Sequence, residues 1–152
     1  MSEIITASNV FFDCPASTVD DVLGFFSKKA VELGYANDAN TVFEAFRARE
    51  EEGTTGMAGG FAIPHAKTSA VSEAVIMVAK FSGEVEWAST DNVPVKCAIA
   101  LLIPADEAGT THLRLLSKIA KMLINSHKRE RLLAADTADK IIAEVEDALA
   151  YE

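Results

Sequence analysis

Two long and nearly continuous apolar runs, from Ala74 to Phe81 and from Lys96 to Ile103, constrain the fold of this chain more than any other feature. Runs that lack a polar residue at every second position are typical of interior strands covered on both faces of a sheet. Segments with helical periodicity precede and follow this pair of strands. The sequence therefore predicts an α/β fold, a three-layer α/β/α sandwich, which we expect to form a single domain over residues 1–152.

The remaining elements are predicted from periodic apolar positions, capping residues and glycines. Apolar residues spaced three and four apart indicate a helical face, and Ser, Thr and Asn are preferred where a helix begins. The expected caps are Ser17 or Thr18, Asn40 or Thr41, and Thr110 or Thr111. Short strands are expected at 10–12 and 61–64, and helices at 18–33, 41–53, 110–124, 127–135 and 137–149.

The charge and the apolar runs limit the partners and the location of the chain. It carries 23 acidic and 14 basic residues, a formal net charge of −9, which repels nucleic acid and anionic membranes. No apolar run approaches the roughly 20 residues that span a bilayer, and the first residues lack the basic start of a secretory signal. Cys14 and Cys97 are too few for a disulfide framework. We expect a cytoplasmic protein with no nucleic-acid partner and no direct membrane insertion.

A glycine-rich segment from Thr54 to His65 places a histidine directly after a proline, at the end of a short apolar run. Glycine permits positive φ angles and close backbone approach, whereas Pro64 fixes φ and stiffens the approach to the next residue. The pattern predicts that the imidazole of His65 is held rigidly where a strand meets a loop, as a nucleophile is usually presented. A histidine in this position can also be purely structural or merely exposed.

Two further side chains are candidates to act with His65. His112 is expected in the first turn of the helix at 110–124, where unpaired backbone N–H groups and the helix dipole favour an anion. Arg49 lies near the end of the helix at 41–53 and offers a planar, permanently charged donor suited to phosphate. The combination indicates phosphoryl chemistry on an imidazole. The simpler alternatives are local hydrogen bonding for His112 and ion pairing with Glu44 or residues 50–52 for Arg49.

Other chemistries lack their sequence signatures. His65 and His112 have no CxxC pair or HExxH helix to complete a zinc site, so we expect no metal. The sequence contains neither a Walker loop nor a GxGxxG fingerprint, and no serine lies in a GxSxG turn. We therefore expect no cofactor, no bound nucleotide and no hydrolysis by a Ser-His-Asp triad.

The candidate residues lie within a pattern that resembles a known family. The segments Arg49-Glu50, Gly53 to Gly56 and Gly60 to His65 resemble the signature of the fructose/mannitol-type enzyme IIA domains of the bacterial phosphoenolpyruvate:sugar phosphotransferase system (PTS). The second half follows the family's order and spacing at 81–83, 85–87, 101–104 and 112–116, so the resemblance covers essentially the full chain. Ala58 and Gly59 depart from it, because many members have glycine followed by a polar or acidic residue there.

The resemblance implies a mixed sheet flanked by helices and a phosphocarrier function. His65 corresponds to the histidine that accepts a phosphoryl group from the phosphohistidine carrier protein HPr. That group then passes to a cysteine of an enzyme IIB, expected here on a separate polypeptide, and on to sugar entering through the membrane enzyme IIC. The sugar is left open: fructose, mannitol, galactitol and glycosides all fit. Some relatives in the nitrogen-type PTS regulate other proteins instead, and such a regulatory binding module is the alternative function.

The resemblance also assigns roles around His65. His112 matches the family's second active-site histidine, and Arg49 matches its active-site arginine. Thr55 matches a hydroxyl position beside the phosphohistidine. Thr55, Gly56 and Pro64 are the expected phosphate-binding or supporting positions.

Overall fold

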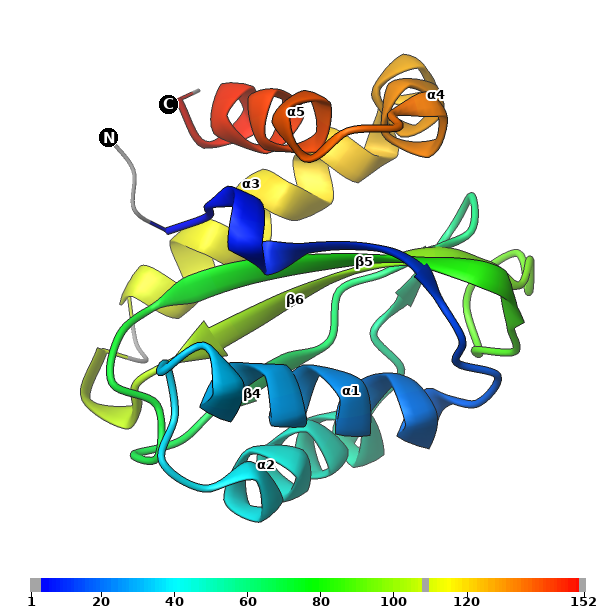
Figure 1. Cartoon of the computed structure of the whole chain (residues 1–152). Coiled ribbons are helices and arrows are strands. Elements are labelled where there is room, and N and C mark those ends of the chain that lie inside the picture. Colours follow the sequence, from blue (N-terminus) through cyan, green and yellow to red (C-terminus); the bar gives the residue numbers. More distant parts are fainter. Residues whose placement is uncertain (1–3, 108–109, 151–152) are drawn as a thin grey trace.

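The computed structural model describes residues 4–107 and 110–150, which form a mixed β-sheet with helices on both faces (Figure 1). The strands are β1 (Val10–Cys14), β2 (Gly56–Met57), β3 (Phe61–Ala62), β4 (His65–Lys67), β5 (Val75–Val85) and β6 (Val95–Ile103). The α-helices are α1 (Val19–Glu32), α2 (Ala39–Glu52), α3 (Thr110–Ile124), α4 (Ser126–Ala134) and α5 (Ala138–Ala150). Two short 3₁₀ helices complete the fold. η1 (Ala7–Asn9) precedes β1, and η2 (Ala105–Glu107) follows β6.

The sheet has the order β1-β5-β6-β3-β2, and β4 also pairs with β6. Strands β5 and β6 are antiparallel, whereas β1 is parallel to β5, and both β3 and β4 are parallel to β6. Because β5 occupies one edge of β6, the short strands β3 and β4 share its other edge, where His65 lies opposite Leu101. The mixed sheet within a three-layer sandwich, as the sequence predicted, is confirmed.

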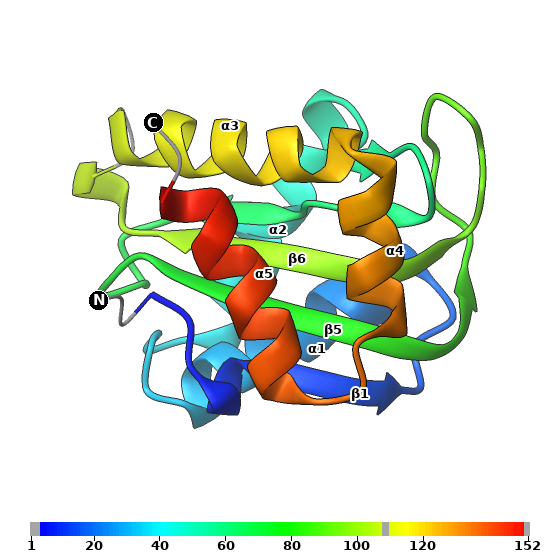
Figure 2. The ribbon, with the colours of Figure 1, turned by 90° about the horizontal axis from the view of Figure 1, so that it is seen from above.

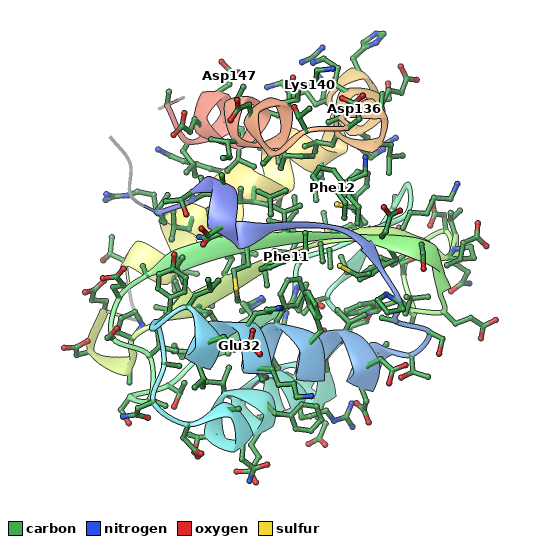
Figure 3. The ribbon with its side chains drawn as sticks, viewed as in Figure 1. Phe11, Phe12, Glu32, Asp136, Lys140 and Asp147 are labelled. Carbon is green, nitrogen blue, oxygen red and sulfur yellow. The ribbon has the colours of Figure 1, made fainter. Side chains whose placement is uncertain are left out.

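Successive residues of the central strands face opposite helical layers. In β5, Met77 belongs to the core formed with α1 and α2, whereas Ile76 and Val78 belong to the core formed with α3 and α5. Phe11 and Phe12 in β1 likewise point to opposite sides of the sheet (Figure 3). The view from above shows α3, α4 and α5 over β5 and β6, with α1 and α2 beneath (Figure 2). Coverage on both faces is the reason that these strands are apolar at nearly every position.

The helix starts differ in part from the predicted caps. Thr18 caps α1 as predicted, and its hydroxyl accepts the backbone N–H of Asp21 at 3.0 Å. The prediction of Asn40 or Thr41 for α2 is wrong, because Asp38 is the cap and its carboxylate accepts the N–H of Thr41 at 3.1 Å. For α3, the predicted cap is Thr110 or Thr111. The helix already includes Thr110, and the position before it, where its cap would lie, falls outside the described residues.

The strand predicted at 61–64 is interrupted. β3 ends at Ala62 and β4 begins at His65, because Pro64 between them has no N–H to donate to a neighbouring strand. The carbonyl of Pro64 still accepts the N–H of Leu101 at 3.0 Å. His65 is therefore the first residue of a paired strand, which ties its backbone to the centre of the sheet. The patterns did not predict β2, which has only two residues, or the extension of β5 to Val85.

Replacing Lys80 with methionine is expected to lower the free energy of unfolding by about 2 kcal/mol. The Lys80 ammonium on β5 donates to three carbonyls at the end of α4, those of Leu132 (3.0 Å), Leu133 (2.7 Å) and Ala135 (2.7 Å). The last carbonyls of a helix have no partner within it, so the substitution leaves these groups unsatisfied. Urea denaturation measures the effect. Lys96→Met is the matched control, because this exposed lysine makes only a long ion pair of 4.0 Å at the surface. Equal urea midpoints for Lys80→Met and Lys96→Met would contradict the prediction.

Candidate functional site

The side chain of His65 is almost fully buried, with 4% of its surface exposed. It enters the site from β4, whose pairing with β6 starts at His65 itself. The preceding Pro64 is also buried, and its carbonyl bonds to the next strand. The backbone on both sides of the imidazole is therefore fixed by the sheet, so the position of the ring depends little on loop motion.

Two hydrogen bonds define the protonation of the His65 ring. Nε2 lies 3.0 Å from Nε of Arg49, and a guanidinium can only donate, so Nε2 must be an acceptor. Nδ1 lies 2.9 Å from the carbonyl oxygen of Ile63, which can only accept. The ring is thus neutral, with its proton on Nδ1 and a lone pair on Nε2. A lone pair on a fixed nitrogen is what a nucleophilic histidine requires.

Arg49 reaches this nitrogen from the last turn of α2. Its Nη1 donates to the carbonyl of Gly53 at 2.7 Å, and its Nε donates to His65. A cation at a helix C-terminus is favoured by the helix dipole. Within residues 4–107 and 110–150, no carboxylate lies within 4.0 Å of the guanidinium. The alternative of an ordinary ion pair for Arg49 is therefore not what this structure shows.

His112 approaches His65 from the first turn of α3. The two ring centroids are 4.8 Å apart, with an angle of 60° between the ring planes. Nδ1 of His112 is buried and has no hydrogen-bond partner in the described part of the chain. Burial, followed by the positive charges of Lys67 and Arg49, lowers the pKa of His112 below its usual range. A second imidazole with an unsatisfied nitrogen thus lies beside the first.

These side chains line one cavity of about 220 Å³. Its wall is formed by one face of α2, the start of β4 and the start of α3, through Ala45, Ala48, Arg49, Glu52, His65, Lys67 and His112. One arginine, one lysine and one carboxylate contribute to this lining, so basic groups outnumber acidic ones and the cavity is suited to a small anion. A larger hollow of about 560 Å³ between α1 and the start of α2 is lined by neither histidine nor arginine.

Thr55, Gly56 and Pro64, the expected phosphate-binding or supporting positions, do not line the cavity and can only support its wall. Thr55 is buried, and both its hydroxyl and its backbone N–H donate to the carboxylate of Glu50. Gly56 is tightly packed, since a Cβ at this position would lie 2.3 Å from the carbonyl oxygen of Ala88. Pro64 fixes the backbone before His65. All three residues shape the segment that leads to the imidazole.

Sequence reasoning missed Lys67, Glu52 and the two alanines of the cavity. Lys67 is two residues after His65, and alternate residues of a strand point to the same side. The α2 residues of the cavity lie at 45, 48, 49 and 52, the spacing of a single helix face. Both signals are present in the sequence, but they indicate a site only once the position of His65 is known.

We expect His65 to titrate near pH 4. The pKa of His65 is lowered from 6.5 to about 4, and burial is the largest cause. The nearby charges of His112 and Arg49 also lower the pKa, whereas the hydrogen bond to the carbonyl of Ile63 raises it. The unfolded chain takes up this proton at a higher pH than the folded protein does. Protonation of His65 therefore does not change the free energy of unfolding above pH 6.5, but lowers it as the pH falls, by about 3 kcal/mol at pH 4.

Two measurements check this pH dependence. An NMR titration of the ring follows the pKa of His65 directly. Urea unfolding of the wild type and of His65→Gln at neutral and acidic pH should show a smaller loss of stability in the variant. A pKa of His65 near 6.5, or an equal loss in both proteins, would contradict the expectation.

A family model described as "Phosphoenolpyruvate-dependent sugar phosphotransferase system, EIIA 2" matches residues 3–148. The chain is 32% identical over 148 residues to the "PTS system fructose-specific EIIA component" of Haloferax volcanii, covering 95% of this chain and 96% of that protein. It is also 32% identical over 147 residues to the "Nitrogen regulatory protein" of Pseudomonas aeruginosa, covering 97% and 95% of the two chains. Sugar-specific and regulatory relatives are thus equally similar.

A solved structure of enzyme IIAMTL in complex with phosphorylated enzyme IIBMTL from Escherichia coli has the same fold. The TM-score is 0.79 at 17% sequence identity, and the match covers 94% of this chain and 97% of that one. None of the helices described here is long and apolar enough to cross a membrane. The described residues also contain no group of three or more His, Cys, Asp and Glu side chains that could hold a metal ion.

Proposed function

The chain belongs to the EIIA 2 family of the phosphoenolpyruvate-dependent sugar phosphotransferase system, and we propose that it is a phosphocarrier that holds a phosphoryl group on Nε2 of His65. The observation that carries this proposal is the buried, neutral imidazole with its proton on Nδ1 and its lone pair on Nε2, beside a cavity that Arg49 and Lys67 help to line. A pKa lowered to about 4 keeps this ring neutral near neutral pH, so that the lone pair on Nε2 is available.

The proposed reaction is an in-line displacement at phosphorus. The Nε2 lone pair forms the new P–N bond while the bond from phosphorus to the donor's imidazole nitrogen breaks, and that nitrogen keeps the electron pair. Arg49 occupies Nε2 in the resting protein, so its guanidinium must release this nitrogen as the phosphoryl group arrives. It can then donate to the phosphoryl oxygens. The proton on Nδ1 stays on the ring, where the Ile63 carbonyl stabilises the positive charge that develops.

Positioning and electrostatics supply the rest of the catalysis. Phosphoryl transfer leaves little covalent chemistry for a protein to perform, and fixed positive groups around the phosphoryl oxygens stabilise the transition state. Arg49 and Lys67 provide positive charges, and His112 provides a buried ring nitrogen without a partner in the described part of the chain. We assign Thr55, Gly56 and Pro64 a supporting role, because they fix the backbone on which His65 stands.

HPr is the proposed donor, and a cysteine of a separate enzyme IIB is the proposed acceptor, which relays the group toward the membrane enzyme IIC. In the second step a cysteine thiolate forms the P–S bond while the P–N bond to His65 breaks. The similar E. coli enzyme IIA has been solved together with a phosphorylated enzyme IIB, which supports this assignment. The cavity is small, so the partner must bring its reacting side chain into it.

The test is transfer from phosphoenolpyruvate through enzyme I and HPr, followed by intact mass. We expect one acid-labile phosphoryl group on the chain and its discharge on addition of the cognate enzyme IIB. If enzyme I and HPr are demonstrably charged and the chain gains no mass, the proposal fails.

Substituting His112 with alanine should slow phosphoryl acceptance by roughly 10–100-fold without unfolding the protein. His112 contacts the His65 ring and has a nitrogen available for a phosphoryl oxygen, but it does not form the new bond. Stopped-flow or quenched-flow transfer from charged HPr measures the rate. His127→Ala is the control, because this histidine on α4 is exposed. Equal rates for His112→Ala and the wild type would remove His112 from the mechanism.

The second candidate is a phosphorylation-dependent regulatory module of the nitrogen-type PTS. Its support is the 32% identity to the P. aeruginosa nitrogen regulatory protein, which equals the identity to the sugar-specific relative. The phosphoryl site would be the same, so the two functions differ in the fate of the phosphorylated protein. Adjacent genes for enzymes IIB and IIC, with phosphate reaching a sugar in a reconstituted system, would support transport. Regulation would be supported if no enzyme IIB removed the phosphoryl group and if the chain bound another protein in a manner that depends on its own phosphorylation state.

A further inference from the structure

Glu50 follows Arg49 in α2 but faces the segment behind the cavity. Its Oε1 accepts the backbone N–H of Thr55 at 3.2 Å and the indole N–H of Trp87 at 3.4 Å, and its Oε2 accepts the Thr55 hydroxyl. One carboxylate thus fixes both donors of a buried threonine. Trp87, which lies 37 residues further along the chain, donates to the same carboxylate oxygen as the Thr55 N–H.

Hydrogen bonds continue from Thr55 to the nucleophile. The carbonyl of Thr55 accepts the N–H of Ile63 at 3.0 Å, and the carbonyl of Ile63 accepts the Nδ1 proton of His65 at 2.9 Å. The N–H and carbonyl of Ile63 lie in consecutive peptide planes that are separated only by the φ and ψ of Ile63, so a shift of the Thr55 carbonyl can turn the Ile63 carbonyl. An unbroken series of contacts therefore joins the Glu50 carboxylate to the ring proton of His65.

The acceptor at Nδ1 matters most during the reaction itself. A neutral imidazole can carry its proton on either nitrogen, and only the Nδ1–H form leaves Nε2 free to attack phosphorus. In the resting protein, Arg49 at Nε2 and the Ile63 carbonyl at Nδ1 both select this form. Once the guanidinium turns to the phosphoryl oxygens, the Ile63 carbonyl alone retains the proton on Nδ1.

The polar groups of Ile63 itself do not bond to β6. Ile63 lies between the two-residue strand β3 and β4, outside the paired residues of both, whereas its neighbours Ala62 and Pro64 bond to β6. Its N–H bonds to Thr55, which lies just after Gly53, a residue with a φ of 150° at the end of α2. We propose that Glu50 is a positioning residue that fixes the tautomer of His65 through Thr55 and Ile63. The proposal rests on the proposed function of His65, but the tautomer can be observed in the unphosphorylated protein.

Glu50→Ala tests the proposal, because it removes both carboxylate oxygens. Because Arg49 also selects the Nδ1–H form in the resting protein, the tautomer is measured in an Arg49→Met background. Nitrogen-15 NMR of the imidazole should show a mixture of tautomers in Arg49→Met/Glu50→Ala, against a single Nδ1–H form in Arg49→Met. Transfer from charged HPr should slow by roughly tenfold or more, in kcat rather than in the KM for HPr. Glu50→Gln keeps one acceptor oxygen and should recover part of both signals. Glu51→Ala is the matched control on the next, exposed position of α2, and should match the wild type.

Thr55→Val provides the same test if Glu50→Ala does not fold, because it removes only the hydroxyl donor to the carboxylate. In the Arg49→Met background, a folded Glu50→Ala or Thr55→Val variant that keeps a single Nδ1–H tautomer would overturn the proposal, whether or not transfer is slower. If the wild type itself is not phosphorylated, the proposed function fails, while the tautomer measurement still decides the role of Glu50.

Discussion

A His65→Ala variant is expected to lose phosphoryl acceptance completely while keeping the fold. The groups around the His65 ring show why no other side chain is placed to accept the phosphoryl group instead. Nε2 of His65 is the unprotonated nitrogen held by Arg49, and the ring of His112 lies to one side, with its centroid 4.8 Å away. Removing the nucleophile from a phosphocarrier removes the bond-forming atom itself, rather than a stabilising contact. Intact mass after incubation with phosphoenolpyruvate, enzyme I and HPr measures the loss.

The fold of this variant should survive because the imidazole contributes little to the two apolar cores. Phe46 on α2 and Ile99 and Leu101 on β6 remain fully buried and hold the layers together around the site. Circular dichroism and urea unfolding provide the control, with His65→Gln as a variant of more similar volume. A folded His65→Ala protein that still gains one acid-labile phosphoryl group would show that the acceptor is another residue.

Arg49→Met should produce the second-largest effect, a decrease of roughly 10²–10³-fold in the rate of transfer from HPr. The substitution keeps an unbranched apolar stem but removes the donor to Nε2, the donor to the carbonyl of Gly53 and the permanent charge in the cavity. Arg49→Lys should recover only part of the rate, because an ammonium lacks the planar fork that binds two phosphoryl oxygens. Rapid-quench measurements of the single-turnover rate separate these variants.

Arg47→Met is the matched control, since this arginine lies on the same helix and pairs with Asp20 and Glu51 at the surface. A loss of rate in Arg49→Met no larger than in Arg47→Met would show that the charge at Nε2 is not used in transfer. The pKa of His65 provides a second signal. It should rise in Arg49→Met, because Arg49 is one of the charges that lower it, yet stay below 6.5, because burial is the larger cause.

The layers of the fold could be predicted because each of their signals is local or strongly periodic. The apolar runs of β5 and β6 show burial on both faces, and the capping residue of α1 lies three positions before the Asp21 N–H that it binds. The two-residue strand β2 gives no such signal. It forms by pairing with β3, the short strand expected within 61–64, which in turn pairs with β6. A pairing between distant segments cannot be read from either segment alone.

The site divides in the same way. His65, His112 and Arg49 could be named from residue type and local context, and the structure brings them to one cavity. The orientation of Thr55 could not be predicted, because its hydroxyl is directed by Glu50, whose carboxylate also accepts a bond from Trp87. The role of a side chain in such a network depends on partners that are far apart in the sequence.

The most direct test of the central claim is nitrogen-15 and phosphorus-31 NMR of the phosphorylated protein, which identifies the atom that carries the phosphoryl group. We predict a single phosphorylated imidazole, that of His65, with phosphorus bonded to Nε2 and the proton retained on Nδ1. Phosphorus on Nδ1 of His65, or on His112 or any other residue, would contradict the account.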